Sequence, residues 1–261
     1  MCSSDLMAHA TVYGVRRAGA DATAADTVLP EIQLPEGVLA EFAGKAVVSR
    51  LGIAVPRGGL ARALDEAHEI AQCVGFPVVL KAQSGELAHK SDAGGVILGI
   101  ADQTALAAAW QRLHAAVAAA RPGLALDGVL VEAMAPSGLE MIVGGRRDPD
   151  WGPVLIAGLG GVWVEALDDV RLMPPDLSPA AFAAELSKLK GVALLHGLRG
   201  RPPADLAAVA DTLAKIGALL RAHPEVKEIE LNPLVVYPTG VLALDVLLIT
   251  APAGPLAPTS P

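Results

Sequence analysis

Two apolar segments in the C-terminal part of the chain restrict the fold more than any other feature. The segments VKEIELNPLVV (226–236) and VLALDVLLI (241–249) are joined through Pro238-Thr239-Gly240, residue types that are typical of a tight turn. We therefore expect two antiparallel strands at this point.

The first of these strands places oxygen-bearing side chains on one face. Because side chains alternate along a strand, Glu228, Glu230 and Asn232 lie opposite Ile229 and Leu231. The ordinary explanation of such a row is an outer face in contact with water.

Asp245 favours a different explanation, because it is the only polar residue of the second segment. An ionised carboxylate in an apolar strand is costly unless something compensates it. In an antiparallel pair, Asp245 approaches the oxygens of Glu230 and Asn232. Such oxygen ligands suit Mg²⁺, which commonly keeps the phosphates of a substrate as further ligands. The pattern predicts a magnesium site and a phosphorylated substrate.

Helix-like and strand-like segments alternate before this pair. Amphipathic or capped patterns predict helices over 40–51, 65–74 and 103–120, one starting at Ser178-Pro179, and one within 202–223. Apolar runs predict strands over 52–58, 76–83, 94–100, 127–134, 139–146 and 152–159. The expected fold class is α/β, of the α+β kind.

Both ends of the chain differ from the part between them. Residues 1–38 lack sustained periodicity, and residues 251–261 are rich in proline. We expect a poorly ordered extension and a tail there. The expected domains between them are 39–132 and 133–250.

Composition excludes several classes of function. The net charge of −8 and the lack of a dense Lys/Arg run argue against nucleic acid as a partner. The most apolar stretch, 151–164, contains four glycines and is too short to span a membrane. Cys2 and Cys73 have no metal-type spacing. No signal pattern is present at the N-terminus, so we expect a cytoplasmic protein without membrane association.

Four further features each allow a functional and a purely structural explanation. Lys81, in FPVVLKAQS, requires an anion if it is buried, or reaches water from the strand end. The glycines of AGLGG (157–161) bring backbone N–H groups to phosphates, or form a tight turn. Arg199 contacts phosphate or caps a helix. His89, in GELAHKSDAGGVILG, is a reacting group or a polar residue of a turn.

Taken together, these stretches resemble the ATP-grasp domain of the ADP-forming acyl-CoA synthetases, the β subunit of acetate–CoA ligase (ADP-forming) enzymes. The resemblance covers residues 39–249 in collinear order. It is carried by GFPVVLKAQS, HKSDAGGV, GVLVEAM, GLEMIVGGRRDPDWGPV, GLGGVWVEALDDV, LLHGLRGRPP, EIELNPLVV and LALDV.

The resemblance implies an ATP-grasp fold, in which two α+β subdomains clasp Mg·ATP. Subdomain 39–132 carries a phosphohistidine loop, and subdomain 133–250 carries the Mg·ATP site. By position, the resemblance assigns His89 to phosphoryl relay, Lys81, Glu132, Glu140, Gly160, Gly161 and Arg199 to nucleotide binding, and Glu230, Asn232 and Asp245 to Mg²⁺.

The sequence departs from the family pattern at three positions. Glu230 stands where the family more often has aspartate, a change that shifts the metal slightly. His196 and Val246 replace residues that are more usual in the family, and neither change is expected to abolish activity.

The implied function is that of the nucleotide-binding β subunit of an ADP-forming acyl-CoA synthetase, an acid–thiol ligase. His89 passes a phosphoryl group between ADP/ATP and a phosphohistidine of a CoA-binding α subunit, which handles acyl-CoA and phosphate. The expected state is a hetero-oligomer.

The sequence leaves two alternatives, the first of which belongs to a different functional class. One is a non-catalytic ATP-sensing regulatory module. The other is an ATP-grasp ligase that acts through an acyl phosphate on an amine. The HKSD loop argues against the second, because that chemistry needs no histidine relay.

Overall fold

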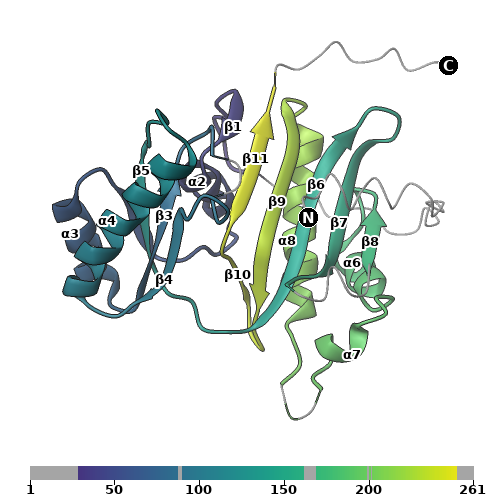
Figure 1. The fold of residues 1–261 in the computed structure, drawn as a ribbon. Helices are drawn as coiled ribbons and strands as arrows, with labels where there is room; N and C mark the ends of the chain where they lie inside the picture. The colour runs from purple at the N-terminus through teal and green to yellow at the C-terminus, as the bar shows by residue number, and fades with distance from the viewer. Residues whose placement is uncertain (1–28, 88–89, 162–168, 199, 201, 252–261) are drawn as a thin grey trace. The chain divides into compact units, whose positions relative to one another are not determined.

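The structure is a computed structural model, and it describes residues 29–87, 90–161, 169–198, 200 and 202–251. The chain forms two compact units. Unit 1 takes the residues up to Leu39, Val47–Ala54 and the residues from Ser137 onward, and unit 2 takes Ala40–Ala46 and Val55–Pro136. Each unit contains its own β-sheet (Figure 1).

Unit 2 is built on an antiparallel sheet with the strand order β2-β5-β3-β4. The strands are β2 (Gly58–Ala61), β3 (Val78–Gln83), β4 (Val96–Ile100) and β5 (Gly128–Ala133). Helices α3 (Leu64–Val74) and α4 (Gln103–Ala120) pack on one face of this sheet (Figure 1).

The two faces of the unit 2 sheet differ in chemistry. Val78, Leu80 and Ala82 of β3 are fully buried in the core with apolar residues of α3 and α4. Because side chains alternate along a strand, Lys81 and Gln83 lie on the opposite face. This second face carries the charged residues described below.

Unit 1 contains a larger antiparallel sheet with the order β1-β11-β9-β6-β7-β8, in which β10 also pairs with β9. The strands are β1 (Gly37–Leu39), β6 (Leu139–Asp148), β7 (Gly152–Leu159), β8 (Val170–Met173), β9 (Val226–Val236), β10 (Val241–Ala243) and β11 (Val246–Thr250). Helix α8 (Leu206–Ala222) packs against β6, β7 and β9, and α6 (Pro179–Leu186) packs against α8 and β8 (Figure 1).

Two further helices complete the described elements. Helix α2 (Glu41–Arg50) follows β1, and α7 (Val192–Leu195) follows α6.

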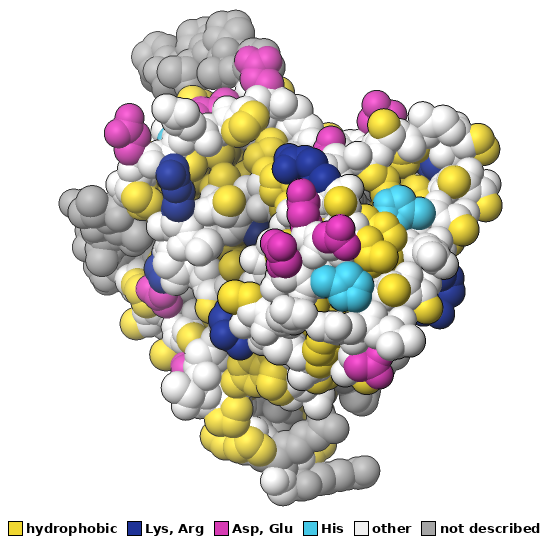
Figure 2. Space-filling model, turned by 90° about the vertical axis from the view of Figure 1, so that its left-hand side faces the viewer, with side chains coloured by type: hydrophobic (Ala, Val, Ile, Leu, Met, Phe, Trp, Pro, Cys, Tyr) yellow, Lys and Arg dark blue, Asp and Glu magenta, His cyan; other side chains and the backbone are white. Residues whose placement is uncertain are grey.

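No helix among the described residues is both long and apolar enough to cross a membrane. Lys and Arg side chains lie singly among Asp and Glu on the face shown in Figure 2, in agreement with the scattered charges of the sequence.

Most predicted elements are confirmed, with five differences. The single strand predicted over 241–249 is divided into β10 and β11, with Leu244 and Asp245 between them. Helix α7 was not predicted. The strand predicted over 52–58 is wrong, because β2 begins only at Gly58. Pro56 explains the difference, since it has no N–H to donate to a strand ladder. Strands β1 and β8 were not predicted, and with three and four residues they are too short for a clear alternation. Strand β1 starts at Gly37, inside the range that the sequence assigned to the extension.

Asp205 joins the start of α8 to the turn between β9 and β10. Its Oδ1 accepts a hydrogen bond from the Ala208 N–H (3.0 Å), and its Oδ2 accepts one from the Gly240 N–H (2.8 Å). These N–H groups, Gly240 first, hold the pKa of the Asp205 carboxyl below its usual value. The contact therefore fixes the strand pair 226–243 against the main helix of unit 1.

We predict that Asp205→Ala lowers the free energy of unfolding by about 1–2 kcal/mol near neutral pH, measured by urea denaturation. Because the folded-state pKa is lowered, this stabilisation is present above the unfolded pKa and disappears as the pH falls through the folded pKa. The control is Asp211→Ala, which removes a 57% exposed side chain of the same helix and should change the free energy by less than about 0.5 kcal/mol. Equal losses of unfolding free energy in Asp205→Ala and Asp211→Ala would contradict the stabilising role of Asp205.

Candidate functional site

Five charged side chains gather on the sheet face of unit 2 that lies opposite α3 and α4. They come from the first turns of α2, from β3, from the turn before β4 and from β5. The five residues are Glu41, Lys45, Lys81, Lys90 and Glu132. We call this set the lysine cluster.

Glu41 is the centre of the lysine cluster. Its Oε1 lies 2.6 Å from the Lys81 Nζ and 2.7 Å from the Lys45 Nζ, and its Oε2 lies 2.5 Å from the Lys90 Nζ. The Lys45 Nζ also donates to both oxygens of Glu132, at 2.5 and 2.7 Å, and the Lys81 Nζ lies 3.2 Å from the Glu132 Oε2. Glu41, Lys45 and Glu132 are each less than 5% exposed.

Burial and charge act against each other in this cluster. Burial raises the pKa of Glu41, but the positive charges of Lys81, Lys45 and Lys90 outweigh it and hold that pKa far below its usual value. Burial, together with the nearby charge of Lys81, lowers the pKa of Lys45, although Glu41 and Glu132 act in the opposite direction. Glu41 is therefore an ionised carboxylate on which three ammonium groups converge.

Local structure explains why α2 starts at this point. The Phe42 N–H, in the first turn, donates to the Gln83 Oε1 at 3.0 Å, so β3 satisfies a backbone donor that a helix start leaves open. Glu41 is the first residue of α2, where the helix dipole favours a negative charge. The first turn of α2 is thus fastened to β3 at two positions, Lys81 and Gln83.

A second group of polar residues lies in unit 1 on β9 and next to β11. The predicted antiparallel pairing is confirmed, with Leu231 opposite Val246. The Asn232 N–H donates to the Asp245 carbonyl oxygen at 3.2 Å, and the Asn232 Nδ2 donates to the Glu230 Oε1 at 2.9 Å. Glu230, Asn232 and Asp245 therefore form one local group.

The donor atoms of this group fit a hard divalent cation. Among the described residues, no three His, Cys, Asp or Glu side chains are arranged to hold a metal ion. The group offers two carboxylates and one amide oxygen, which cannot by themselves fill the coordination shell of Mg²⁺. This agrees with the usual behaviour of that ion, which is bound by one or two carboxylates together with substrate phosphates.

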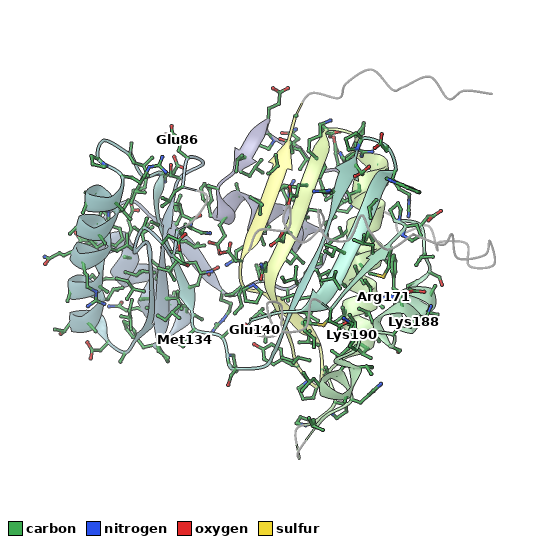
Figure 3. The ribbon with its side chains drawn as sticks, turned by 45° about the vertical axis from the view of Figure 1, so that its right-hand side comes forward. Glu86, Met134, Glu140, Arg171, Lys188 and Lys190 are labelled. Atoms are coloured by element: carbon green, nitrogen blue, oxygen red, sulfur yellow. The ribbon has the colours of Figure 1, made fainter. Side chains whose placement is uncertain are left out.

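Glu140 and two glycines form a third group, also in unit 1. The Gly160 N–H donates to the Glu140 carbonyl oxygen at 2.7 Å. A Cβ at Gly160 would lie 3.0 Å from the backbone of Glu140, and one at Gly161, where φ is +61°, would lie 2.9 Å from the Glu140 Oε2. Glycine is therefore required where the chain leaves β7 (Gly152–Leu159) beside Glu140, which Figure 3 labels.

The structure brings the predicted residues together in three local groups, each within one unit. Lys81 and Glu132 belong to the lysine cluster. The other two groups are Glu140 with Gly160 and Gly161, and Glu230 with Asn232 and Asp245. Two predicted residues, His89 and Arg199, lie outside the described residues.

Sequence reasoning missed three members of the lysine cluster. Glu41 and Lys45 are four residues apart on α2, a spacing that is typical of ion pairs on exposed helix surfaces. In the sequence, Lys90 is marked only as a charged residue of a polar loop. The structure also shows that the Glu132 carboxylate contacts Lys45 and Lys81, whereas the resemblance assigned Glu132 to nucleotide binding.

Comparisons with known proteins identify the relatives of this chain. The ATP-grasp domain matches residues 32–249. A trans-feruloyl-CoA synthase from an unknown prokaryotic organism is 42% identical over 232 residues, which are 88% of this chain and 33% of that protein. The β subunit of acetate–CoA ligase (ADP-forming) I from Pyrococcus furiosus is 36% identical over 211 residues, which are 81% of this chain and 91% of that subunit.

Solved structures give a consistent result. Acetyl-coenzyme A synthetase 1 of Ca. Korarchaeum cryptofilum, in complex with coenzyme A and Ca-AMPCP, has a TM-score of 0.79 and 35% identity, and the match covers 82% of this chain and 94% of that chain. Another structure of the same protein, with a TM-score of 0.70 and 34% identity, contains coenzyme A and Mg-AMPPCP. Its phosphohistidine segment points towards the nucleotide binding site.

Proposed function

Because this chain belongs to the ATP-grasp family, and within it to the β subunits of ADP-forming acetate–CoA ligases, we propose that it is the nucleotide-binding part of an ADP-forming acyl-CoA synthetase. The ATP-grasp fold expected from the sequence is confirmed by the family match and by the related structures. The proposed enzyme class is an acid–thiol ligase of the acetate–CoA ligase (ADP-forming) type.

The proposed reaction is the transfer of a phosphoryl group through His89. A ring nitrogen of His89 attacks the phosphorus of a partner phosphohistidine, and the P–N bond to the partner breaks. A terminal oxygen of ADP then attacks the phosphorus on His89, so that a P–O bond forms, the second P–N bond breaks and ATP is released. Over the whole cycle, acyl-CoA, phosphate and ADP give acid, CoA and ATP, and the reverse direction uses the same steps.

Histidine suits this role because of its ordinary chemistry. With a reference pKa of about 6.5, much of its imidazole is neutral and nucleophilic near neutral pH. An imidazole that has accepted a phosphoryl group is also a good leaving group, so that it can give the group up again.

The remaining residues are proposed to bind and orient the nucleotide. Lys81, Arg199 and the turn at Gly160 and Gly161 would contact phosphate, and Glu132 and Glu140 would each contact the nucleotide. Mg²⁺ would be held by the group Glu230, Asn232 and Asp245. When bound, the ion supplies positive charge that offsets the charge of the phosphates.

A CoA-binding partner is part of the proposal. The chain corresponds to one third of the trans-feruloyl-CoA synthase but to nine-tenths of the separate β subunit, at 33% and 91% of their lengths. We therefore infer that an α subunit or domain binds acyl-CoA and phosphate and supplies the phosphohistidine. The names of the relatives differ in the acyl group, and the choice of acid is assigned to that partner.

The observation that carries the proposal is the hydrogen-bonded pair Glu230 and Asn232 beside Asp245, in a chain that belongs to this family. The test is incubation of the whole purified chain with γ-labelled ATP and Mg²⁺. We expect label on the protein that EDTA prevents and that an excess of ADP removes. Binding of the nucleotide without transfer of label would instead favour an ATP-sensing regulatory module.

A further inference from the structure

We propose that Glu41 is a positioning residue whose two carboxylate oxygens hold Lys81 and Lys90 together, so that both ammonium groups are directed at the phosphates of the nucleotide. The inference deepens the proposed function and rests on it. Its basis is that Lys81 contacts the Oε1 of Glu41 at 2.6 Å and Lys90 contacts the Oε2 at 2.5 Å. One carboxylate thus joins a lysine of β3 to a lysine 9 residues further along the chain.

The position of the Glu41 carboxylate is fixed from several sides. Its Oε1 also contacts Lys45 at 2.7 Å, and Lys45 is held by both oxygens of Glu132 on β5. The next residue of α2, Phe42, donates its N–H to Gln83 on β3. With the Glu41 side chain only 1% exposed, these contacts leave the carboxylate little freedom to turn.

Lys90 is held at both its backbone and its side chain. Its carbonyl oxygen accepts a hydrogen bond from the Gly95 N–H at 2.7 Å, and the Gly95 carbonyl oxygen accepts one from the Ala82 N–H of β3 at 2.7 Å. The side chain reaches Glu41 and is 12% exposed. Glu41 therefore ties the turn that begins at Lys90 to α2, and Lys90 is the residue that directly follows His89 in the sequence.

Removal of the charge at position 41 has a definite electrostatic consequence. Three described cations face this carboxylate, namely Lys45 from α2, Lys81 from β3 and Lys90 from its turn, and Glu132 from β5 contacts two of them. With glutamine at position 41, Glu132 is the only carboxylate left in the lysine cluster. Like charges and burial then favour the neutral form of a lysine, so positive charge is lost at a lower pH than in the wild type.

The test measures the affinity of the whole chain for Mg-AMPPCP by isothermal titration calorimetry between about pH 6.5 and pH 9.5. We expect Glu41→Gln to raise the dissociation constant about tenfold near neutral pH, and by more as the pH rises, whereas the wild type changes little. A pH-dependent loss separates positioning of cations from a general structural defect, which would weaken binding equally at each pH.

Glu185→Gln is the matched control. Glu185 also contacts two cations of unit 1 through separate oxygens, Arg171 at 2.6 Å and Lys188 at 2.5 Å. Figure 3 labels Arg171 and Lys188. We expect this variant to bind Mg-AMPPCP as the wild type does at every pH. A loss in Glu185→Gln as large as that in Glu41→Gln would overturn the inference.

A double-mutant cycle with Lys90→Met tests whether Glu41 acts through Lys90. If it does, Glu41→Gln weakens binding less in the Lys90→Met background than in the wild type. Strictly additive effects, or a pH-independent loss in Glu41→Gln, would overturn the inference. If circular dichroism shows that Glu41→Gln does not fold, Lys90→Met alone tests the inference. An unchanged dissociation constant of Lys90→Met for Mg-AMPPCP would then overturn the inference. A wild-type chain that does not bind Mg-AMPPCP refutes the proposed function itself, and the inference with it.

Discussion

His89→Asn is expected to abolish transfer of the γ-phosphoryl group of ATP to this chain, with a loss of at least about a thousand-fold in the rate of labelling. Asparagine keeps a polar side chain at this position but has no imidazole nitrogen to attack phosphorus. The loss should be confined to transfer, and the affinity for Mg-AMPPCP should stay within about threefold of the wild type. This split follows because the proposed role of His89 is nucleophilic attack.

Labelling with γ-labelled ATP, followed by acid and base treatment of the denatured protein, measures this effect. Phosphate on an imidazole nitrogen is released by acid and survives base, so the wild-type label should be lost in acid. The matched control is His114→Asn on α4, which removes an exposed histidine whose Nδ1 lies 2.9 Å from the Trp110 carbonyl oxygen. Labelling of His89→Asn at the level of His114→Asn would refute the relay.

Asp245→Asn is expected to raise the Mg²⁺ concentration that gives half-maximal nucleotide binding by about ten- to a hundred-fold. The substitution preserves the shape of the side chain and removes its negative charge, and Mg²⁺ prefers anionic oxygen ligands. Asp245 lies between β10 and β11, and its backbone bond to Asn232 does not depend on its side chain, so the fold should be retained.

Titration of Mg²⁺ at a fixed AMPPCP concentration measures this shift. Glu228→Gln provides the control, because it removes a carboxylate from the same strand as Glu230, two residues earlier. We expect the half-maximal Mg²⁺ concentration of that variant to stay within about twofold of the wild type. The same Mg²⁺ requirement in Asp245→Asn and the wild type would contradict the proposed Mg²⁺ site at Glu230, Asn232 and Asp245.

The group Glu230, Asn232 and Asp245 shows what the sequence alone can predict. The turn at 238–240 sets the register of the strands that it joins, and the period of a strand sets the face of each side chain. From these two rules Asp245 was expected beside Glu230 and Asn232, and the structure pairs Asn232 with Asp245 through the backbone. Local periodicity was sufficient because the contacts lie within one strand pair.

The lysine cluster shows where such reasoning fails. A buried Lys81 was expected to require an anion, and the resemblance assigned Lys81 to nucleotide binding. The structure supplies two protein carboxylates, Glu41 and Glu132, which lie 40 residues before and 51 residues after Lys81 in the chain. No periodic pattern links positions so far apart, and the Glu41–Lys45 spacing alone looks like an exposed pair. Only the contacts of Glu41 and Phe42 with β3 reveal the cluster.

The central claim is that this chain binds a nucleotide together with Mg²⁺. Isothermal titration calorimetry of the whole wild-type chain with AMPPCP, in Mg²⁺ and then in EDTA, tests it most directly. The account predicts binding of one nucleotide per chain with a dissociation constant between about 1 μM and 1 mM in Mg²⁺, and a marked loss of affinity in EDTA. No binding in Mg²⁺, or the same affinity in EDTA, would contradict it.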